Sequence, residues 1–344
     1  MSTDPLANEK LVFVYLGKKF PGYARKSIKF AKKYSGLDVV LVCEKKFIRT
    51  GLDDKHTYLL SNNYKKRLSQ NLANSAHAKF RKGFWLKTTE RFFALEEYMQ
   101  SNQIKQCFHA ELDNLIFAND GLANRLNTFG SGLFLPFDSQ NRAIASIMYL
   151  NSTTTLRNFC QFVDQIDGNY NDMELLALYG AINPSGVFAL PSSIENRILK
   201  SELLQKGIQT INENDIGIFD AAAIGQWYFG IDPRNSYFKI RNRFINDVAE
   251  VDLSEFQMRW SDKPFRFHAS DKTKGRKEYL VNNLHIHSKI HRKITRPGAL
   301  ISIVNRTDSG YKIVISQNVL GMYRGLKFLT LSALAKVQKM SKAP

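Results

Sequence analysis

The stretch LVFVYLGKKFPGYARKSIKFAKKYSGLDVVLVC, residues 11–43, decides the fold class. It begins with a continuous apolar run, which is typical of a strand buried on both faces of a parallel sheet. A turn with Gly and Pro at residues 17–22 ends the run, apolar residues at helical spacing follow, and a second apolar run occupies residues 38–43. This order of strand, turn, helix and strand predicts a βαβ unit, and therefore an α/β chain with a mostly parallel sheet flanked by helices.

Length and composition indicate a folded globular chain. The 344 residues are 44% hydrophobic and 12% aromatic, which excludes disordered and fibrous classes. The 3 cysteines are odd in number and sit in apolar contexts, which fits reduced thiols better than disulfides. The N-terminal residues lack an apolar signal region, and no run of about 18 apolar residues predicts a membrane span. We therefore expect a cytoplasmic protein.

The chain is strongly basic. Lys and Arg number 49 against 31 Asp and Glu, which gives a formal charge of +18. Such an excess attracts polyanions, so the candidate partners are nucleic acid, an anionic membrane surface and phosphorylated small molecules. The basic residues are spread over several runs, and neither an RNP-type aromatic signature nor zinc-finger spacing occurs. The pattern therefore does not single out nucleic acid.

A pair of acids follows the next predicted strand. Residues 104–108 predict a short buried strand, and Glu111 and Asp113 come shortly after it. In an extended backbone residues i and i+2 point to the same side, so the two carboxylates could bind Mg²⁺ or Mn²⁺ and leave positions open for substrate phosphates. The alternative is that the acids only cap a helix predicted over residues 114–127. The spacing alone leaves both interpretations open.

Glycine and cationic residues mark the same end of the predicted sheet. Ligands of parallel sheets collect at the carboxyl ends of the strands, which is where the turn with Gly17 and Lys18 lies. This turn lacks both the complete glycine fingerprint of dinucleotide folds and a Walker lysine motif, so alone it predicts only a ligand-binding end. A helix predicted over residues 84–99 carries Arg91, whose guanidinium could meet a pyrophosphate or the acids themselves.

Three further acids are candidates for a general base. Asp172 and Glu174 stand in the first turn of a helix that Asn171 opens, where helix capping explains them and a base toward a sugar hydroxyl is the alternative. Asp220 belongs to IFDAAAIGQWYFGIDPRN, residues 218–235. The small residues after Asp220 let another backbone approach closely, which fits a polar-ligand pocket and tight helix packing equally well.

Two histidines alternate near the C-terminus. In LHIHSK, residues 284–289, His285 and His287 share one face of a predicted strand, and Lys289 follows. Two imidazoles on one face predict a metal or phosphate site, which only the fold could bring to Asp113. Further on, a basic amphipathic helix is predicted at about residues 323–340, either on a membrane interface or packed back on the domain.

Shorter patterns complete the predicted order of elements. Helices are predicted over residues 64–80, 152–165 and 193–205, and short strands over residues 132–136, 143–149, 207–218 and 298–304. Polar loops near residue 168 and over residues 262–275 are candidate boundaries, and neither compels a division into two domains.

Five segments, taken in order, resemble those of GT-A-type nucleotide-sugar glycosyltransferases, more narrowly bacterial enzymes that build surface polysaccharide or lipopolysaccharide. They are LVFVYLGKKFPGY, FWLKTTERFFALEEYM, FHAELDNLIF, FDAAAIGQWYFGIDPRN and LHIHSK, within residues 11–289. The resemblance implies a GT-A-like α/β fold with a mostly parallel, Rossmann-like sheet. Residues 1–130 would bind the nucleotide sugar, and residues 131–344 would form the acceptor-binding and C-terminal portion of the same domain.

The resemblance also implies a metal site. Asp113 would ligate a divalent metal, Mn²⁺ or Mg²⁺, with Glu111 either a second ligand or a contact to the donor ribose or sugar. Here Glu stands where the family usually has Asp. His287, or with less support His285, would add an imidazole to the metal. Lys289 would then neutralise the leaving diphosphate.

Donor and acceptor contacts follow from the same resemblance. The turn with Gly17 and Lys18 resembles the loop that contacts the donor base. An inverting enzyme needs a carboxylate base to deprotonate the acceptor hydroxyl, and a retaining enzyme does not. The candidates for this base, in order, are Asp172, Glu174 and Asp220.

The favoured hypothesis is therefore a metal-dependent glycosyltransferase with a glycan or lipid-linked glycan acceptor. It would lie on the anionic inner face of the cytoplasmic membrane as a peripheral protein, without nucleic acid as a partner. The alternative is a basic nucleic-acid-binding protein, or a metal-dependent nuclease that uses Glu111 and Asp113. A third hypothesis is a non-catalytic, membrane-associated scaffold whose acids are only a helix cap.

Overall fold

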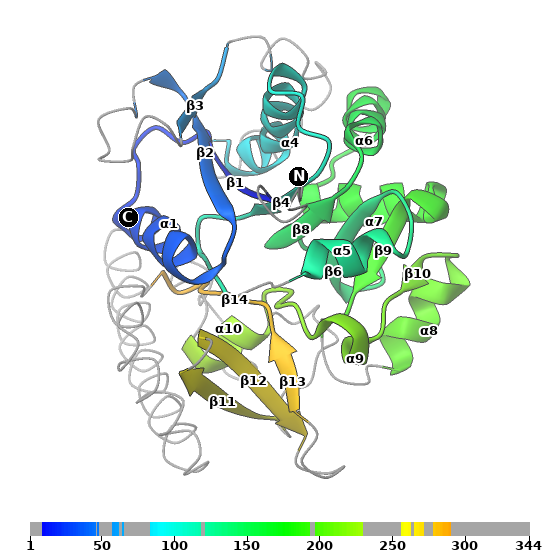
Figure 1. Cartoon of the computed structure of the whole chain (residues 1–344). Helices are drawn as coiled ribbons and strands as arrows, with labels where there is room; N and C mark the ends of the chain where they lie inside the picture. The colour runs from blue at the N-terminus through cyan, green and yellow to red at the C-terminus, as the bar shows by residue number, and fades with distance from the viewer. Residues whose placement is uncertain are drawn as a thin grey trace, which may run out of the picture.

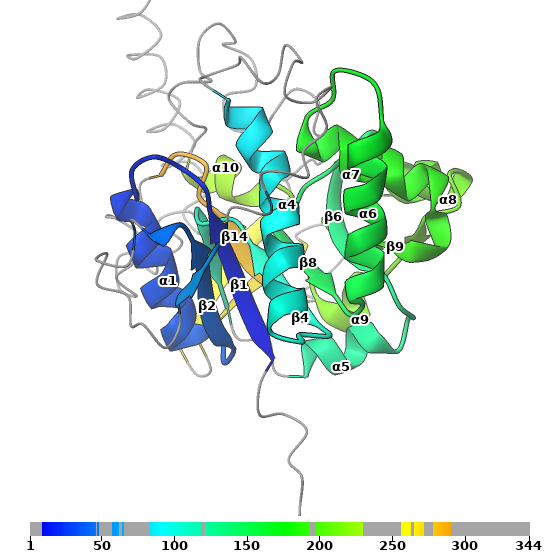
Figure 2. The same ribbon diagram turned by 90° about the horizontal axis from the view of Figure 1, so that it is seen from above.

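The computed structural model describes residues 9–45, 47, 57–61, 64, 83–117, 121–192, 197–229, 256–262, 265–271 and 278–289. Within these residues a 9-stranded sheet forms the centre, helices cover both of its faces, and two small antiparallel sheets lie at one end (Figures 1 and 2). The predicted α/β class, with a mostly parallel sheet flanked by helices, is confirmed. The elements predicted over residues 298–304 and 323–340, and nearly all of 64–80, lie outside the described residues.

The predicted βαβ unit forms the N-terminal part of the sheet. β1 (Lys10–Tyr15) pairs in parallel with β2 (Asp38–Cys43), and α1 (Gly22–Tyr34) connects them. On its other edge β1 pairs in parallel with β4 (Cys107–Ala110), while β2 pairs with β3 (Thr57–Leu59). Because β1 and β4 run in the same direction, the residues that follow them share one edge of the sheet.

The remaining half of the sheet contains two reversed strands, one of which is only 2 residues long. The order is β10-β9-β6-β8-β4-β1-β2-β3, and β8 runs antiparallel to β4 and β6, whereas β6, β9 and β10 pair in parallel. The bounds are β6 (Leu133–Ser139), β7 (Arg142–Ala143), β8 (Ile147–Leu150), β9 (Val187–Leu190) and β10 (Gln209–Thr210). The strand predicted over residues 143–149 is thus split between β7, which pairs with β6, and β8. Because β8 is reversed, it begins where β4 ends.

Alternating side chains of the strands supply a core on each face of the sheet. Val12 joins a core with α4, α6, α7 and α8, whereas Leu11 and Phe13 join a second core with α1, α5 and α9. The bounds are α4 (Phe84–Ser101), α5 (Leu122–Asn127), α6 (Thr153–Gln165), α7 (Asp172–Ile182), α8 (Arg197–Gln205) and α9 (Glu213–Ile216). Burial on both faces explains the unbroken apolar runs of β1 and β2.

The last described strands form the two small sheets. β11 (Phe256–Asp262), β12 (Phe265–Asp271) and β13 (Glu278–Val281) make an antiparallel sheet of their own. β14 (Asn283–His285) pairs instead with β5 (Asn114–Ile116), and α10 (Ile224–Phe229) packs against β14. The β5–β14 pair ties the end of the described chain to the segment that carries the predicted acids.

Two predicted elements are wrong. Residues 114–116 form strand β5 rather than the first turn of a helix, and α5 begins only at Leu122. The pairing of β5 with β14 joins segments far apart in the sequence, and the local spacing of apolar residues cannot predict such a pairing. Residues 207–218 contain helix α9 beside the short strand β10, because the Asn212 side chain accepts the Asn214 N–H at 2.9 Å and caps a helical turn.

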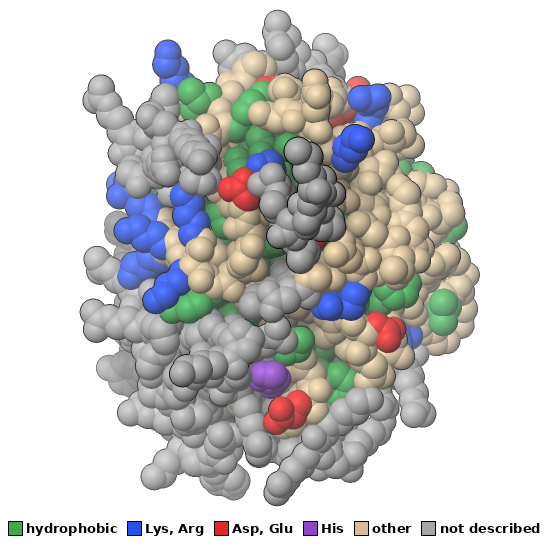
Figure 3. All heavy atoms as spheres, in the orientation of Figure 1, with side chains coloured by type: hydrophobic (Ala, Val, Ile, Leu, Met, Phe, Trp, Pro, Cys, Tyr) green, Lys and Arg blue, Asp and Glu red, His purple; other side chains and the backbone are tan. Residues whose placement is uncertain are grey.

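Basic side chains gather on the side of the molecule where α1 lies (Figure 3). α1 contains no acid, and its exposed residues include Arg25, Lys29, Lys32 and Lys33. Among the helices that the structure describes, none is long and apolar enough to cross a membrane.

Candidate active site

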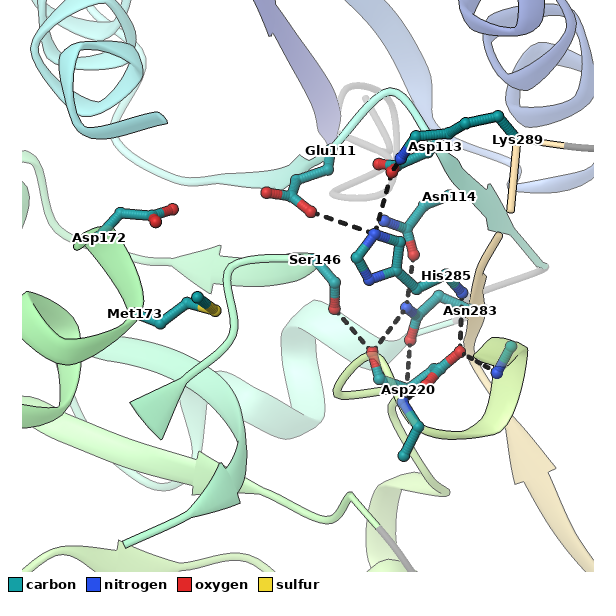
Figure 4. A network of polar contacts seen from close by, with 12 residues as sticks. Glu111, Asp113, Asn114, Ser146, Asp172, Met173, Asp220, Asn283, His285 and Lys289 are labelled. Atoms are coloured by element: carbon teal, nitrogen blue, oxygen red, sulfur yellow. Dashed lines mark hydrogen bonds and ion pairs between the residues drawn. The ribbon is translucent and has the colours of Figure 1, made fainter. Parts of the chain in front are cut away.

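Glu111 and Asp113 lie in a tight turn between β4 and β5. The Asn114 N–H donates to the Glu111 carbonyl at 3.1 Å and closes the turn, and the Glu111 N–H donates to the Ser146 carbonyl at 2.9 Å. The two acids therefore lie in a turn, and the extended backbone predicted for them from the sequence is wrong. The turn nevertheless brings both carboxylates to the side chain of one histidine (Figure 4).

That histidine is His285, the last residue of β14. Its Nε2 lies 3.1 Å from Asp113 Oδ2 and 3.4 Å from Glu111 Oε2, and its side chain is 6% exposed. His287, the imidazole that the sequence analysis favoured, lies in the turn after the strand, with its ring centroid 5.6 Å from that of His285. The His287 N–H donates to the His285 carbonyl at 2.9 Å, so the chain bends there and the predicted strand alternation ends.

The donor atoms of Glu111, Asp113 and His285 fit a divalent cation. One ligand atom from each residue lies within 4.8 Å of the others. Nε2 of His285 faces the two carboxylates, while its Nδ1 has no hydrogen-bond partner among the described residues. An octahedral ion with bonds of about 2.1 Å separates neighbouring ligands by about 3 Å, close to the Asp113–His285 spacing. The mixed oxygen and nitrogen donors suit a first-row ion such as Mn²⁺ better than Mg²⁺, which takes oxygen ligands.

Lys289 contributes a positive charge to the same cluster. Its ammonium group forms an ion pair with the Asp113 carboxylate and lies 5.4 Å from the centroid of the Tyr23 ring on α1. Burial lowers the pKa of Lys289 to about 8, although Glu111 opposes this shift. Lys289 adopts a left-handed backbone conformation, with φ of 59°, which turns the side chain back toward the acids.

Arg91 of α4 joins Glu111 to Asp172. The guanidinium forms an ion pair with Glu111 and donates from Nη2 to Asp172 Oδ2 at 2.7 Å, and its side chain is 8% exposed. Burial tends to raise the pKa of Glu111, but Arg91, His285 and Lys289 together bring it below the ordinary value. Glu111 is therefore ionised near neutral pH. The sequence predicted that Arg91 would contact either a pyrophosphate or the acids, and in the structure it contacts Glu111 and Asp172.

The two candidate bases on α7 have different surroundings. Burial raises the pKa of Asp172, although Arg91 opposes the rise, and Asp172 faces Glu111 across the site (Figure 4). Glu174 instead accepts the Asn171 N–H at 2.9 Å, while the Asn171 side chain accepts the Glu174 N–H at 3.1 Å. This capping box holds Glu174 at the helix terminus.

Asp220, the third candidate base, lies beneath the cluster. It is completely buried, and both of its carboxylate oxygens accept backbone N–H groups, including that of His285 at 2.8 Å. Burial raises the pKa of Asp220, while His285 and the backbone donors oppose the rise. With its acceptor positions filled inside the protein, Asp220 is not placed to receive a proton from a substrate.

The loop with Gly17 and Lys18 follows β1, the strand beside β4. A Cβ atom on Gly17 would lie 2.3 Å from the Tyr15 hydroxyl, so any other residue there would have to displace the Tyr15 ring. Lys18 is exposed. Lys87 of α4, which the sequence analysis did not single out, donates to the Leu16 carbonyl at 3.0 Å and fixes the start of the loop. The loop thus opens at the sheet edge that carries the acids.

Three polar residues in the site escaped the sequence analysis. Ser146, Asn114 and Asn283 are buried, and Asn283 Nδ2 donates to Asn114 Oδ1 at 2.8 Å. Each stands next to apolar strand residues, and none belongs to a recognised motif. Their partners come from distant segments, because the pairing of β5 with β14 brings Asn283 to Asn114, and the Ser146 hydroxyl donates to the Asp220 carbonyl at 2.7 Å.

Comparisons with known proteins give likenesses to solved structures alone. No protein-family model matches the chain, and no curated protein matches it. Mouse xyloside xylosyltransferase 1 is 10% identical, with a TM-score of 0.38, and covers 60% of this chain and 94% of its own. LgtC is 12% identical, with a TM-score of 0.38, over 56% of this chain and 77% of its own. A glycosyltransferase involved in the glycosylation of the major capsid of PBCV-1 is 10% identical, with a TM-score of 0.32, over 59% of this chain and 93% of its own. At these scores none of them assigns a function.

Proposed function

We propose that this chain is a metal-dependent glycosyltransferase that moves a sugar from a nucleotide-sugar donor to a glycan acceptor. The observation that carries the proposal is the convergence of Glu111, Asp113 and His285 at the carboxyl end of β4. These ligands lie beside the cation of Lys289 and at the sheet edge where parallel sheets bind nucleotides. The ordered resemblance of five sequence segments to GT-A-type enzymes supports the same conclusion.

The chain's own residues would hold the donor diphosphate in two ways. Asp113, His285 and Glu111 would bind a divalent cation, preferably Mn²⁺, which when bound supplies Lewis acidity to the phosphates. Lys289 would exchange its contact with Asp113 for the diphosphate oxygens and stabilise the negative charge that grows there as the bond to the sugar breaks. Arg91 keeps Glu111 ionised and oriented toward the site.

Asp172 remains our candidate for the general base of an inverting reaction. Its Oδ1 has no hydrogen-bond partner among the described residues, and burial raises its pKa toward the range in which a base works well. Glu174 and Asp220 are engaged in the capping box and in backbone contacts, so we do not extend the proposal to them. A retaining reaction would need none of these bases.

The acceptor and the cellular setting are proposals from sequence and charge. Residues 1–130 would form the donor half, with Gly17 and Lys18 near the base, and residues 131–344 the acceptor side of the same domain. The formal charge of +18 and the basic face of α1 (Figure 3) fit an enzyme on the anionic inner leaflet, where it would extend a lipid-linked surface glycan.

The test combines donor binding with turnover. Thermal-shift measurements with UDP-, GDP-, CMP- and dTDP-sugars, each with Mn²⁺, should identify a stabilising donor, and slow hydrolysis of that donor should follow. Asp113→Asn and His285→Gln should abolish hydrolysis while the protein remains folded. Glu213→Gln is a matched control, because Glu213 is a buried acid of α9 paired with Lys200 at 2.6 Å.

The competing hypotheses predict different results. A nuclease or nucleic-acid-binding protein would show no shift with any nucleoside diphosphate and would bind DNA or RNA with an affinity that falls steeply with salt. A scaffold would bind anionic vesicles with no effect of metal or nucleotide. Either pattern would refute the glycosyltransferase proposal.

A further inference from the structure

The Asp220 side chain has its acceptor positions filled by backbone donors. Oδ1 accepts the N–H groups of Ala223 and Ile224, both at 2.8 Å, and Oδ2 accepts those of Gly225 at 2.7 Å and His285 at 2.8 Å. An ionised carboxylate satisfies four N–H donors, whereas a protonated carboxyl would direct its own O–H at one of them. Asp220 thereby joins the first turn of α10 to the backbone of a candidate metal ligand.

The Asp220 backbone is fixed by the neighbours of the other ligands. Its N–H donates to Asn283 Oδ1 at 2.9 Å, and its carbonyl accepts the Ser146 hydroxyl at 2.7 Å. Asn283 also binds Asn114, and the Ser146 carbonyl holds the Glu111 N–H. Segments that carry all three candidate ligands therefore meet at Asp220 (Figure 4).

Gly225 allows α10 to press directly on the backbone of His285. A Cβ atom on Gly225 would lie 2.0 Å from the His285 carbonyl oxygen and 2.9 Å from Asp220 Oδ2. No side chain fits in this space. The peptide groups of His285 are thus held on two sides, the N–H by Asp220 and the carbonyl by the close approach of Gly225.

The imidazole itself has no such support. Nε2 of His285 faces the carboxylates of Glu111 and Asp113, but within the described parts of the chain Nδ1 has no hydrogen-bond partner. Histidines that bind metals are usually oriented by a partner on the ring nitrogen that does not bind the metal. Here the position of the ring is therefore set through the backbone, where Asp220 acts.

We propose that Asp220 is a positioning residue of the cation site, which places Nε2 of His285 beside Glu111 and Asp113. This inference rests on the proposed function, because it assumes that the three ligands hold a metal. It assigns Asp220 a task different from that of a general base, and it explains why an acid followed by small residues stands so far from the metal ligands in the sequence.

The test is Mn²⁺ binding by the nucleotide-free protein, measured from the electron paramagnetic resonance signal of the free ion. Asp220→Asn keeps the size of the side chain but replaces one acceptor oxygen with an NH₂ group that cannot accept an N–H. We expect the Mn²⁺ affinity to fall about 10- to 100-fold, the usual effect of losing a residue that orients a metal ligand.

A spectroscopic signature separates positioning from a general structural role. Mn²⁺ bound to wild-type protein should show nitrogen modulation of its electron spin echo, and His285→Gln should remove it and so identify its source. In Asp220→Asn the ion that still binds should have lost this modulation. A residue that only stabilised the fold would lower the unfolding temperature and leave the nitrogen signal intact.

Two controls make the outcomes distinguishable. Glu213→Gln should bind Mn²⁺ like the wild type, and Asp113→Asn should lose binding. If Asp113→Asn loses binding while Asp220→Asn keeps wild-type affinity and nitrogen modulation, the role of Asp220 is refuted and the proposed function survives. If the wild type itself does not bind Mn²⁺, both the role of Asp220 and the proposed function are refuted.

A second variant covers the case in which Asp220→Asn does not fold. Ser146→Ala removes only the hydrogen bond from the Ser146 hydroxyl to the Asp220 carbonyl. Unchanged Mn²⁺ affinity and nitrogen modulation in Ser146→Ala would then refute the role of Asp220.

Discussion

Arg91 is the residue whose removal should destabilise the site most, because its guanidinium neutralises two acids in a largely buried place. Its side chain is 8% exposed, and that of its partner Asp172, at 2.7 Å, is 3% exposed. Removing one partner of a buried ion pair typically costs about 3–5 kcal/mol, because the other charge stays buried without compensation. We therefore expect Arg91→Met, which keeps an unbranched apolar stem, to lower the free energy of unfolding by about 3–5 kcal/mol at pH 7.

The pH dependence of this loss identifies its cause. Burial already raises the pKa of Asp172, and Arg91 opposes the rise. Without Arg91 the folded-state pKa moves further above the unfolded value, so the folded protein binds more protons than the unfolded chain as the pH falls. The variant should therefore regain stability relative to the wild type as the pH is lowered from 7 toward about 4, the ordinary carboxyl range.

Urea unfolding followed by tryptophan fluorescence, in EDTA, measures the effect. Arg91→Met, Asp172→Asn and the double variant form a mutant cycle. The double variant should be more stable than the sum of the single losses predicts by at least about 1 kcal/mol, because it no longer contains the unpaired Asp172 charge. Additive losses, or a deficit that does not change with pH, would show that Arg91 acts through the packing of its stem, and the electrostatic argument would be refuted.

Three other predictions concern single groups. Lys289→Met should tighten Mn²⁺ binding to the nucleotide-free protein roughly tenfold, because a competing cation beside Asp113 is removed, and unchanged affinity in the Mn²⁺ titration would contradict this. Glu174→Ala should lower the free energy of unfolding in urea by about 0.3–1 kcal/mol and leave the rate of the proposed sugar transfer unchanged, since Glu174 caps a helix. A large loss of rate would make Glu174 a catalytic candidate again. Burial, aided by Arg91, lowers the pKa of His109 to about 3. Below about pH 6.5 the unfolded chain therefore binds a proton on this imidazole that the folded protein does not bind. The free energy of unfolding should fall by about 2 kcal/mol between pH 7.5 and 5 for this reason. Urea unfolding at several pH values measures this loss, and His109→Asn should flatten it.

Local patterns predicted the parts of the structure that depend on near neighbours. The apolar runs at residues 11–16 and 38–43, with the helix between them, predicted β1, α1 and β2 because both faces of a parallel sheet are buried. Glu174 was rightly linked to helix capping, since a capping box needs only four consecutive residues, whereas Asp172 pairs with the distant Arg91.

The candidate metal site depends on a contact that no local pattern encodes. Asp113 and His285 were each noticed, yet the choice between His285 and His287 turned on where β14 ends, and its end is set by pairing with β5. The same pairing replaced the helix predicted from residue 114. The contacts of Asp220 could not be predicted for a related reason, because its partners His285 and Asn283 lie on that distant strand.

The β5–β14 pair also sets the moment at which the site can form during translation. Glu111 and Asp113 leave the ribosome long before His285, so a growing chain has the two carboxylates of the candidate site, but not its imidazole, until nearly all of the described residues have been made. A polypeptide cut short by premature termination could not complete the cation site.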